Sequence, residues 1–310
     1  MNKNRSNFLI ASPPYNRIFA GVQVLHDLCH ELNVLGYNAA IIFFHSGDGQ
    51  EKPYQWSLSD RPDLYVDGHQ RHQLPGDNPQ KSIAEFLQNG IMIYPEIIKG
   101  NPMGAKRVVR YLLVKENLGI NHYEADYPGE FICAFSKLFH KNPHHTLFKV
   151  TTPDFMNTND AVHWTQRRMD ATYFGKGPKY VECNLIPDTI LIERDWPRDQ
   201  KQLSVMLKST RFLFSYDGCS GIHTDAMMCG AVPVILHEKQ LTRAEQNTAE
   251  LSYPSVFLKN LQDKSSLQFD GHQLDIDIQE FKKNFEYLKY SWQLRVGEFA
   301  SACAKFFKLK

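Results

Sequence analysis

The stretch RFLFSYDGCSGIHTDAMMCGAVPVIL, residues 211–236, carries the strongest fold signal in this chain. It begins with an apolar, aromatic run at 212–216 and passes through a loop of small residues at 217–221. A helix-like segment at 223–229 then leads through a turn to a second apolar run at 232–236. Apolar runs of this length, separated by turn residues and a helical segment, predict strand, loop, helix and strand.

The helix start in this stretch is suited to an anion. A helix that begins just after the carboxyl end of a strand presents free backbone N–H groups and the positive end of its dipole above the sheet. Ser220, Gly221 and Thr224 lead into the helix, and the carboxylates Asp217 and Asp225 flank its start. We therefore predict a phosphate-bearing ligand here. The alternative is that Asp217 caps a turn and Asp225 only complements the helix dipole.

The acidic pair resembles the donor-binding element of the GT-B glycosyltransferases of group 1. In that family a pair in the pattern E-x7-E precedes A-M-A-x-G-x-P-V-V; here Asp217 and Asp225 form the pair, and residues 226–234 read AMMCGAVPV. Both acids are aspartate where the family has glutamate, so their reach is one methylene shorter. The resemblance implies an α/β fold of two Rossmann-like domains with parallel sheets facing across a cleft, and a carboxy-terminal helix that crosses back to the amino-terminal domain.

Length agrees with two domains. With 310 residues, 42% of them hydrophobic, the chain can bury the cores of two domains of about 150 residues each. We predict a Rossmann-like acceptor domain over 1–155, a nucleotide-sugar donor domain over 156–280, and a carboxy-terminal helix over 281–310 that packs on the first domain.

The amino-terminal half has its own alternation of strands and helices. A strand at 7–11, a helix that starts at Gly21 and a strand at 39–44 predict a βαβ unit. Gly21 is our candidate for close backbone approach to the acceptor, and the alternative is a glycine that serves only the turn. A strand at 90–95 ends at Glu96, which we take as the acceptor-side candidate and as the base if the reaction inverts. A carboxylate that hydrogen-bonds a neighbouring loop is the alternative.

Three further segments of this half are less regular. Residues 45–80 are predicted to form a long polar loop, and Asn101-Pro102 is predicted to open a helix that includes Val108 and Leu112. Residues 131–150 are predicted to carry the chain toward the second domain.

Two cations follow the first strands of the predicted donor domain. A strand at 171–174 runs into the loop of Lys176 and Gly177, and a strand at 188–192 is followed by Arg194. A planar guanidinium suits two phosphate oxygens, and an ammonium adds a point charge. By resemblance we assign Lys176, Gly177 and Arg194 to the donor diphosphate, together with Ser220, Gly221 and Thr224. The alternative is that Lys176 and Arg194 are ordinary surface charges. By the same resemblance Asp225 is assigned to ribose hydroxyls, and Asp217 to the sugar as a catalytic residue.

Charge and motif content exclude several classes of function. The 35 basic and 34 acidic residues give a net charge of +1, which provides no electrostatic case for nucleic acid as a general partner. The signatures G-x-S-x-G, H-E-x-x-H and G-x-x-x-x-G-K-[ST] are absent, so hydrolase, zinc peptidase and P-loop kinase activities lose their main support. No cofactor or metal is expected beyond the nucleotide sugar.

The sequence therefore predicts a cytoplasmic glycosyltransferase. The resemblance implies a retaining, metal-independent transfer to a carbohydrate or lipid-linked acceptor, of the type found in bacterial lipopolysaccharide or capsule synthesis. The basic and aromatic end, 305–310, is packed on the domain or else contacts the inner face of an anionic membrane. A GT-B-fold epimerase or phosphorylase, and a non-catalytic sugar-nucleotide-binding subunit, are the alternatives.

Overall fold

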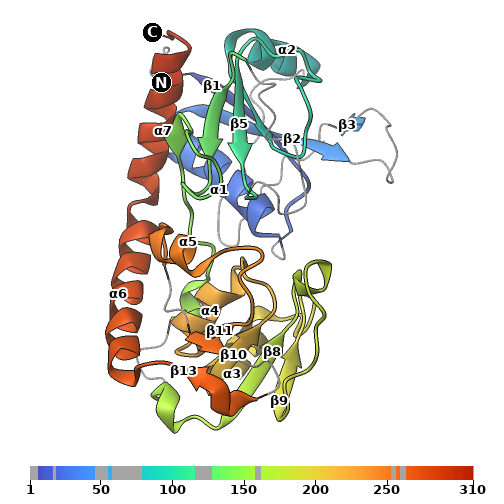
Figure 1. The fold of residues 1–310 in the computed structure, drawn as a ribbon. Coiled ribbons are helices and arrows are strands. Elements are labelled where there is room, and N and C mark those ends of the chain that lie inside the picture. Colours follow the sequence, from blue (N-terminus) through green and yellow to red (C-terminus); the bar gives the residue numbers. More distant parts are fainter. Residues whose placement is uncertain are drawn as a thin grey trace. The chain divides into compact units, whose positions relative to one another are not determined.

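The computed structural model describes residues 6–16, 19–45, 55–57, 79–115, 128–157, 162–252, 256–258 and 263–309. The chain divides into two compact units: unit 1 comprises residues 1–149 and 289–310, and unit 2 comprises residues 150–288. Each unit is built on a mainly parallel sheet with packed helices (Figure 1). The predicted α/β class with two Rossmann-like units is therefore confirmed.

The sheet of unit 1 has seven strands in the order β3-β2-β1-β4-β5-β6-β7. All neighbours are parallel except β2 and β3. The strands are β1 Asn7–Ser12, β2 Asn38–His45, β3 Gln55–Ser57, β4 Ile91–Pro95, β5 Val108–Leu112, β6 Phe131–Ala134 and β7 His145–Thr146.

Helices cover the two faces of this sheet, as the side-chain alternation of β1 requires. Phe8 and Ile10 pack in a core with α1 (Ala20–Val34) and α7 (Trp292–Phe306), whereas Leu9 and Ala11 belong to a second core that includes Phe86 of α2 (Pro79–Asn89). The helix α7, red in Figure 1, contacts α1, so the carboxy-terminal helix completes the amino-terminal unit.

The sheet of unit 2 has six strands in the order β13-β12-β11-β10-β8-β9, of which only β13 is antiparallel to its neighbour. The strands are β8 Met169–Tyr173, β9 Thr189–Ile192, β10 Thr210–Ser215, β11 Val232–Ile235, β12 Val256–Leu258 and β13 Leu267–Gln268. The stretch at residues 211–236 forms most of β10 and all of α4 and β11. Its strands lie inside the sheet, which explains their continuous apolar runs.

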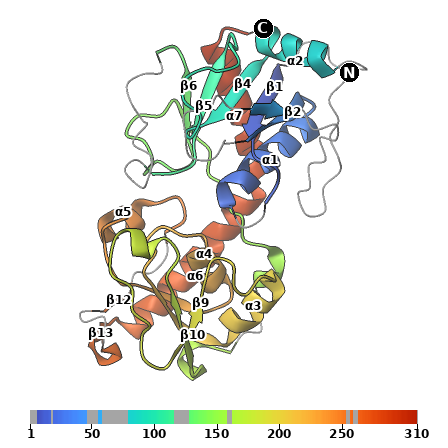
Figure 2. The same cartoon turned by 90° about the vertical axis from the view of Figure 1, so that its right-hand side faces the viewer.

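The helices of unit 2 are α3 Gln200–Ser209, α4 Ile222–Met228, α5 Arg243–Thr248 and α6 Gly271–Tyr290. Figure 2 shows α3 and α4 with the strands of this sheet, and α3 contacts both α4 and β10. Asp199 caps α3 by accepting a hydrogen bond from the backbone N–H of Lys201. The predicted single helix near the end is two helices, α6 and α7, separated at Ser291.

Three predictions for the amino-terminal half are wrong. Residues 108–112 form strand β5 and not a helix, because two β-branched valines begin a short apolar run that fits either structure by periodicity alone. Residues 131–134 and 145–146 are strands of unit 1 and not a plain connection. The predicted loop at 45–80 includes β3 and the start of α2, and its residues 46–54 and 58–78 lie outside the described part of the chain.

A buried arginine explains why periodicity failed in β5. Arg110 is fully buried, and its guanidinium contacts both carboxylate oxygens of Glu130 at 3.0 and 2.9 Å. It also donates to the carbonyls of Ile98 and Gly100. A charged residue in the middle of a strand buried on both sides disguises that strand in the sequence, and only the folded partners make it acceptable.

Candidate functional site

The two sheets have the same topological feature. In unit 1 the chain leaves β1 for β2 on one side and later returns to β4 on the other; in unit 2 it leaves β8 for β9 and returns to β10. The loops that follow the two central strands diverge at such a switch point, and open α/β sheets bind ligands in the crevice that this leaves. The predicted residues Gly21 and Glu96 follow β1 and β4, and Lys176 and Asp217 follow β8 and β10.

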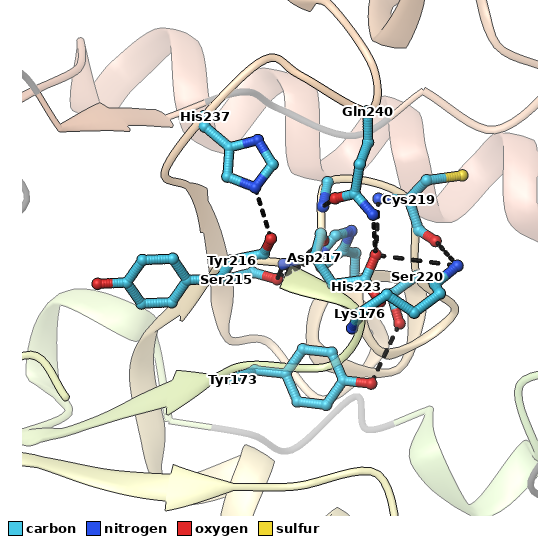
Figure 3. Close-up of polar contacts among 11 residues, drawn as sticks. Tyr173, Lys176, Ser215, Tyr216, Asp217, Cys219, Ser220, His223, His237 and Gln240 are labelled. Atoms are coloured by element: carbon cyan, nitrogen blue, oxygen red, sulfur yellow. Dashed lines mark hydrogen bonds and ion pairs between the residues drawn. The ribbon is translucent and has the colours of Figure 1, made fainter. Parts of the chain in front are cut away.

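Asp217 joins the loops at the switch point of unit 2 (Figure 3). Its side chain is 1% exposed; Oδ2 accepts from the backbone N–H of Lys176 at 3.0 Å. Oδ1 accepts from the backbone N–H of Cys219 at 3.2 Å and from the amide of Gln240 at 3.1 Å. The ammonium of Lys176 lies 3.9 Å from the same oxygen. These contacts favour a positioning role for Asp217, and its catalytic role stays a prediction.

A third loop, which follows β11, is tied to the same centre. Gln240 is 2% exposed, and its carbonyl oxygen accepts from the backbone N–H of Gly218 while its amide reaches Asp217. His237 accepts from the backbone N–H of Lys239 through Nδ1, so the proton of the neutral ring is on Nε2, which contacts the carbonyl of Tyr216 at 2.7 Å. The loops after β8, β10 and β11 thus form one hydrogen-bonded edge.

Beneath these loops lies a buried histidine. His223 of α4 contacts the hydroxyl of Ser215 through Nε2 at 2.9 Å, and that hydroxyl donates to the carbonyl of Asp217. Because the single hydroxyl proton of Ser215 is used there, His223 is the donor. Burial lowers the pKa of His223 to about 4, so the ring is neutral and serves as a fixed support.

Two glycines allow the loop after β8 to pack against the loop after β10. A Cβ at Gly177 would lie 2.5 Å from the Cβ and 2.7 Å from the carbonyl oxygen of Tyr216. Gly175 has a φ of +52°, and a Cβ there would lie 2.6 Å from Oδ2 of Asp217. Gly177 was predicted to face the diphosphate. The structure shows that its missing side chain is needed for packing between the loops.

The other residues predicted to bind the donor lie at the same end of the sheet and differ in their exposure to solvent. Lys176 is 34% exposed and donates to the carbonyl of Cys219 at 3.0 Å. Gly221 is exposed at the start of α4, and a Cβ there would meet nothing within 4 Å. Ser220 and Thr224 are half-buried on either side of it. The predicted anion-binding helix start is therefore open to a ligand.

Asp225 lies in the first turn of α4. Its Oδ1 accepts a hydrogen bond of 2.6 Å from the hydroxyl of Thr152, a residue that the sequence did not single out. Burial raises the pKa of Asp225 from 3.8 to about 6, and the Thr152 hydroxyl opposes this rise. The predicted ribose contact of Asp225 is not tested by these contacts.

Arg194 is exposed in the turn after β9, where Glu193 and Trp196 pair. Its charge acts on the hydroxyl of Tyr173, the last residue of β8, as do the charges of Asp217 and Asp225. Tyr173 was not among the residues predicted from the sequence, although it lies two positions before Gly175, which begins the loop of Lys176. The charges of Arg194, Asp217 and Asp225 all act on the Tyr173 side chain.

The switch point of unit 1 contains Glu96 and Gly21. Glu96 is 3% exposed, and its Oε2 accepts from the backbone N–H of Leu113 at 2.7 Å. Gly21 lies in the first turn of α1, where a Cβ would be 3.5 Å from the Leu113 side chain. The structure therefore brings these two predicted residues to one end of the sheet, on either side of Leu113. Burial raises the pKa of Glu96 from 4.5 to about 7, and the hydrogen bond from Leu113 opposes the rise.

The raised pKa of Glu96 predicts a pH-dependent stability. Between pH 4.5 and 7 the unfolded chain releases a proton that the folded chain retains, so this group's contribution to stability falls as pH rises through that window. We expect Glu96→Gln, which keeps an acceptor for Leu113, to match the wild type near pH 4 and to be more stable by about 3 kcal/mol at pH 8. Urea unfolding at several pH values measures this difference. An unchanging difference between the two proteins would contradict a raised pKa.

Within the part of the chain described above, no helix is long and apolar enough to cross a bilayer.

The loop before α1 is held by a buried histidine. His26 is fully buried and contacts the carbonyl of Pro13 through Nε2 at 3.0 Å, and burial lowers its pKa to about 4. The ring of Tyr15 packs edge-on against it. The neutral imidazole thus fixes the start of the loop that leads to α1, in whose first turn Gly21 lies.

Comparison with known proteins yields no match among protein families or curated proteins. Similar solved structures include a putative UDP-N-acetylglucosamine 2-epimerase from Listeria monocytogenes, with a TM-score of 0.44 and 10% identity over 99% of this chain and 98% of that chain. The spinosyn rhamnosyltransferase SpnG, complexed with thymidine diphosphate, has a TM-score of 0.36 and 10% identity over 97% and 96%. The BGT of phage T4, in complex with UDP-glucose, has a TM-score of 0.34 and 10% identity over 98% and 97%. At such scores the assignment of two Rossmann-like units rests on the strand order of this chain itself.

Proposed function

We propose that this chain is a glycosyltransferase that moves a sugar from a nucleoside-diphosphate donor to a carbohydrate or lipid-linked acceptor. The observation that carries the proposal is the cluster at the switch point of unit 2. Lys176, Ser220 and Asp225 come from two different loop–helix segments to the end of the sheet where α/β folds bind ligands. Arg194, exposed in the turn after the neighbouring strand β9, is the second cation that we assign to this site.

The chemistry of glycosyl transfer explains the need for such a cluster. The bond between the anomeric carbon and the diphosphate oxygen breaks, and its electron pair stays on the diphosphate. A new bond forms between the anomeric carbon and the acceptor oxygen. Negative charge therefore grows on the leaving group, and fixed cations and backbone N–H groups stabilise it without a metal. In this proposal Lys176 and Arg194 contact the diphosphate together with the open start of α4 at Gly221, and Asp225 contacts the ribose.

The proton of the acceptor hydroxyl also needs a destination. In a retaining transfer, which the acidic-pair resemblance favours, the departing phosphate oxygen takes it. In an inverting transfer a base takes it, and Glu96 in unit 1 is our candidate because its pKa of about 7 suits proton transfer near neutral pH. The acceptor class that we propose is a glycan of bacterial surface polysaccharide assembly, handled in the cytoplasm, and it rests on the sequence resemblance alone.

Thermal unfolding against a panel of nucleotides tests the donor site. We expect one of UDP, GDP, TDP, ADP and CMP, or its sugar form, to stabilise the protein by about 2.7 kcal/mol at a hundred times its dissociation constant. Arg194→Ala should raise the dissociation constant of that ligand about tenfold, since a hydrogen bond from a charged group contributes roughly 1.5 kcal/mol or more to binding.

Arg198→Ala is the matched control, because Arg198 is an exposed arginine four positions further along the chain. It should leave the affinity unchanged. If none of the nucleotides or nucleotide sugars shifts the midpoint, the donor site and the transferase function are both rejected. If a nucleotide sugar binds but is converted without an acceptor, an epimerase is the better account, and binding without any turnover of donor would favour a binding subunit.

A further inference from the structure

Tyr173 lies in the candidate donor site, next to Ser220. It is the last residue of β8 and is 6% exposed, and its ring is fixed by the loop that follows, because a Cβ at Gly175 would lie 2.5 Å from its Cε1. Figure 3 shows its hydroxyl directed toward the segment that carries Ser220 and Asp217. The sheet itself therefore holds this hydroxyl at the switch point between β8 and β10.

The hydrogen bonds of this hydroxyl are incomplete. Its oxygen accepts a hydrogen bond from the hydroxyl of Ser220 at 3.5 Å, which is the long end of the range. A phenol has one proton to donate as well, and among the residues that the structure describes none accepts it. By contrast, the hydroxyl of Tyr216 both donates to the carbonyl and accepts from the N–H of Asn184.

The charges around Tyr173 keep the proton on the phenol. Burial raises its pKa above the ordinary value, the hydrogen bond from Ser220 and the charge of Arg194 oppose the rise, and Asp217 and Asp225 add to it. A neutral O–H can donate to an anionic oxygen that a guanidinium also attracts. The ammonium of Lys176, on the same loop, strengthens the preference for an anion.

We propose that the hydroxyl of Tyr173 donates a hydrogen bond to a phosphate oxygen of the bound nucleoside diphosphate, which the charges of Arg194 and Lys176 also attract. This inference rests on the proposed function and adds a ligand-contacting residue that the acidic-pair motif does not contain. A bound phosphate oxygen completes the hydrogen bonding of the phenol. It also explains why a tyrosine is held at the end of β8 by a glycine with positive φ.

Tyr173→Phe tests the proposal, since it removes only the hydroxyl. Isothermal titration should show a dissociation constant for the nucleoside diphosphate that is about tenfold higher than in the wild type, and an unchanged constant for the nucleoside without phosphates. The midpoint of thermal unfolding without ligand should stay near that of the wild type. Tyr216→Phe is the matched control: it should lower the midpoint, because two hydrogen bonds are lost, and leave the ratio of the two dissociation constants as in the wild type.

The outcomes separate this inference from the proposed function. If the wild type binds a nucleoside diphosphate and Tyr173→Phe binds it equally well, the phosphate contact is rejected and the donor site stands. If Tyr173→Phe weakens nucleoside and diphosphate by the same factor, the tyrosine supports the fold of the site only, which also overturns the contact. If the wild type binds no diphosphate, both proposals are rejected.

Discussion

Replacing Asp217 with alanine is expected to lower the free energy of unfolding by about 5 kcal/mol, and to abolish nucleotide binding. The substitution removes the acceptor of two backbone N–H groups and of the Gln240 amide, and it leaves the ammonium of Lys176 without its nearest carboxylate. Each buried donor left without a partner costs about 1–3 kcal/mol. Urea unfolding, followed by aromatic fluorescence, measures the loss.

Two variants sharpen this test. Asp217→Asn keeps one oxygen and the shape of the side chain, so it should lose about half as much. Asp195→Ala, at an exposed position of the same unit, should change stability by less than about 0.5 kcal/mol. A loss below about 1 kcal/mol in Asp217→Ala would show that the three loops are held together by other contacts, and that the carboxylate is free for the catalytic role predicted from the sequence.

The second large effect is expected for Arg167→Met. This arginine is 5% exposed and has no carboxylate within ion-pair distance among the described residues. Its guanidinium donates to the carbonyls of Val162, Leu207, Thr210 and Cys229. The last three of these carbonyls lie at the end of α3, at the start of β10 and at the end of α4, so one side chain holds together the elements that position Asp217 and Asp225.

Methionine matches the length of this side chain but provides no donor, so four carbonyls lose their partner. We expect the free energy of unfolding to fall by about 4 kcal/mol, because four hydrogen bonds from a charged group are lost. The variant no longer has a buried charge, whose desolvation also lowers the pKa of Arg167, and this gain offsets only part of the loss. The adjacent Arg168 is exposed, and Arg168→Met should be nearly neutral. Equal stabilities of the two variants in urea would contradict the role assigned to Arg167.

Features that depend on residues close together in the sequence were predicted correctly, and features that depend on distant residues were not. The strand–loop–helix–strand unit around Asp217 was predictable because its signals lie within 26 residues, and the prediction correctly places Asp217 in the loop after β10 and Asp225 in the first turn of α4. The strand β5 was not predicted, because Arg110 in its middle interrupts the apolar run and makes the hydrophobic pattern ambiguous. Periodicity cannot show that Glu130, 20 residues away, would accept that charge.

The candidate site shows the same limit. Lys176 and Asp217 were selected one by one from their places after strands, and no local pattern indicates that the backbone N–H of Lys176 donates to the carboxylate of Asp217. Gln240 and Thr152 come from distant segments and belong to no motif, so only the folded chain shows that they hold the acidic pair. Tyr173 could have been suspected from its place near the end of the strand predicted at 171–174, since the carboxyl ends of strands are where α/β sheets bind ligands.

The division of the chain between the two units sets an order for assembly. Unit 2 is one continuous segment, 150–288, whereas unit 1 needs both 1–149 and 289–310. The core of unit 1 places Trp292, Val296 and Phe299 against strands from the first third of the chain. During synthesis on the ribosome, residues 150–288 are therefore all available before the core of unit 1 can close. Until then the half-finished first unit exposes the apolar face of β1 that α7 later covers, and it is at this stage that the nascent chain depends most on protection from aggregation.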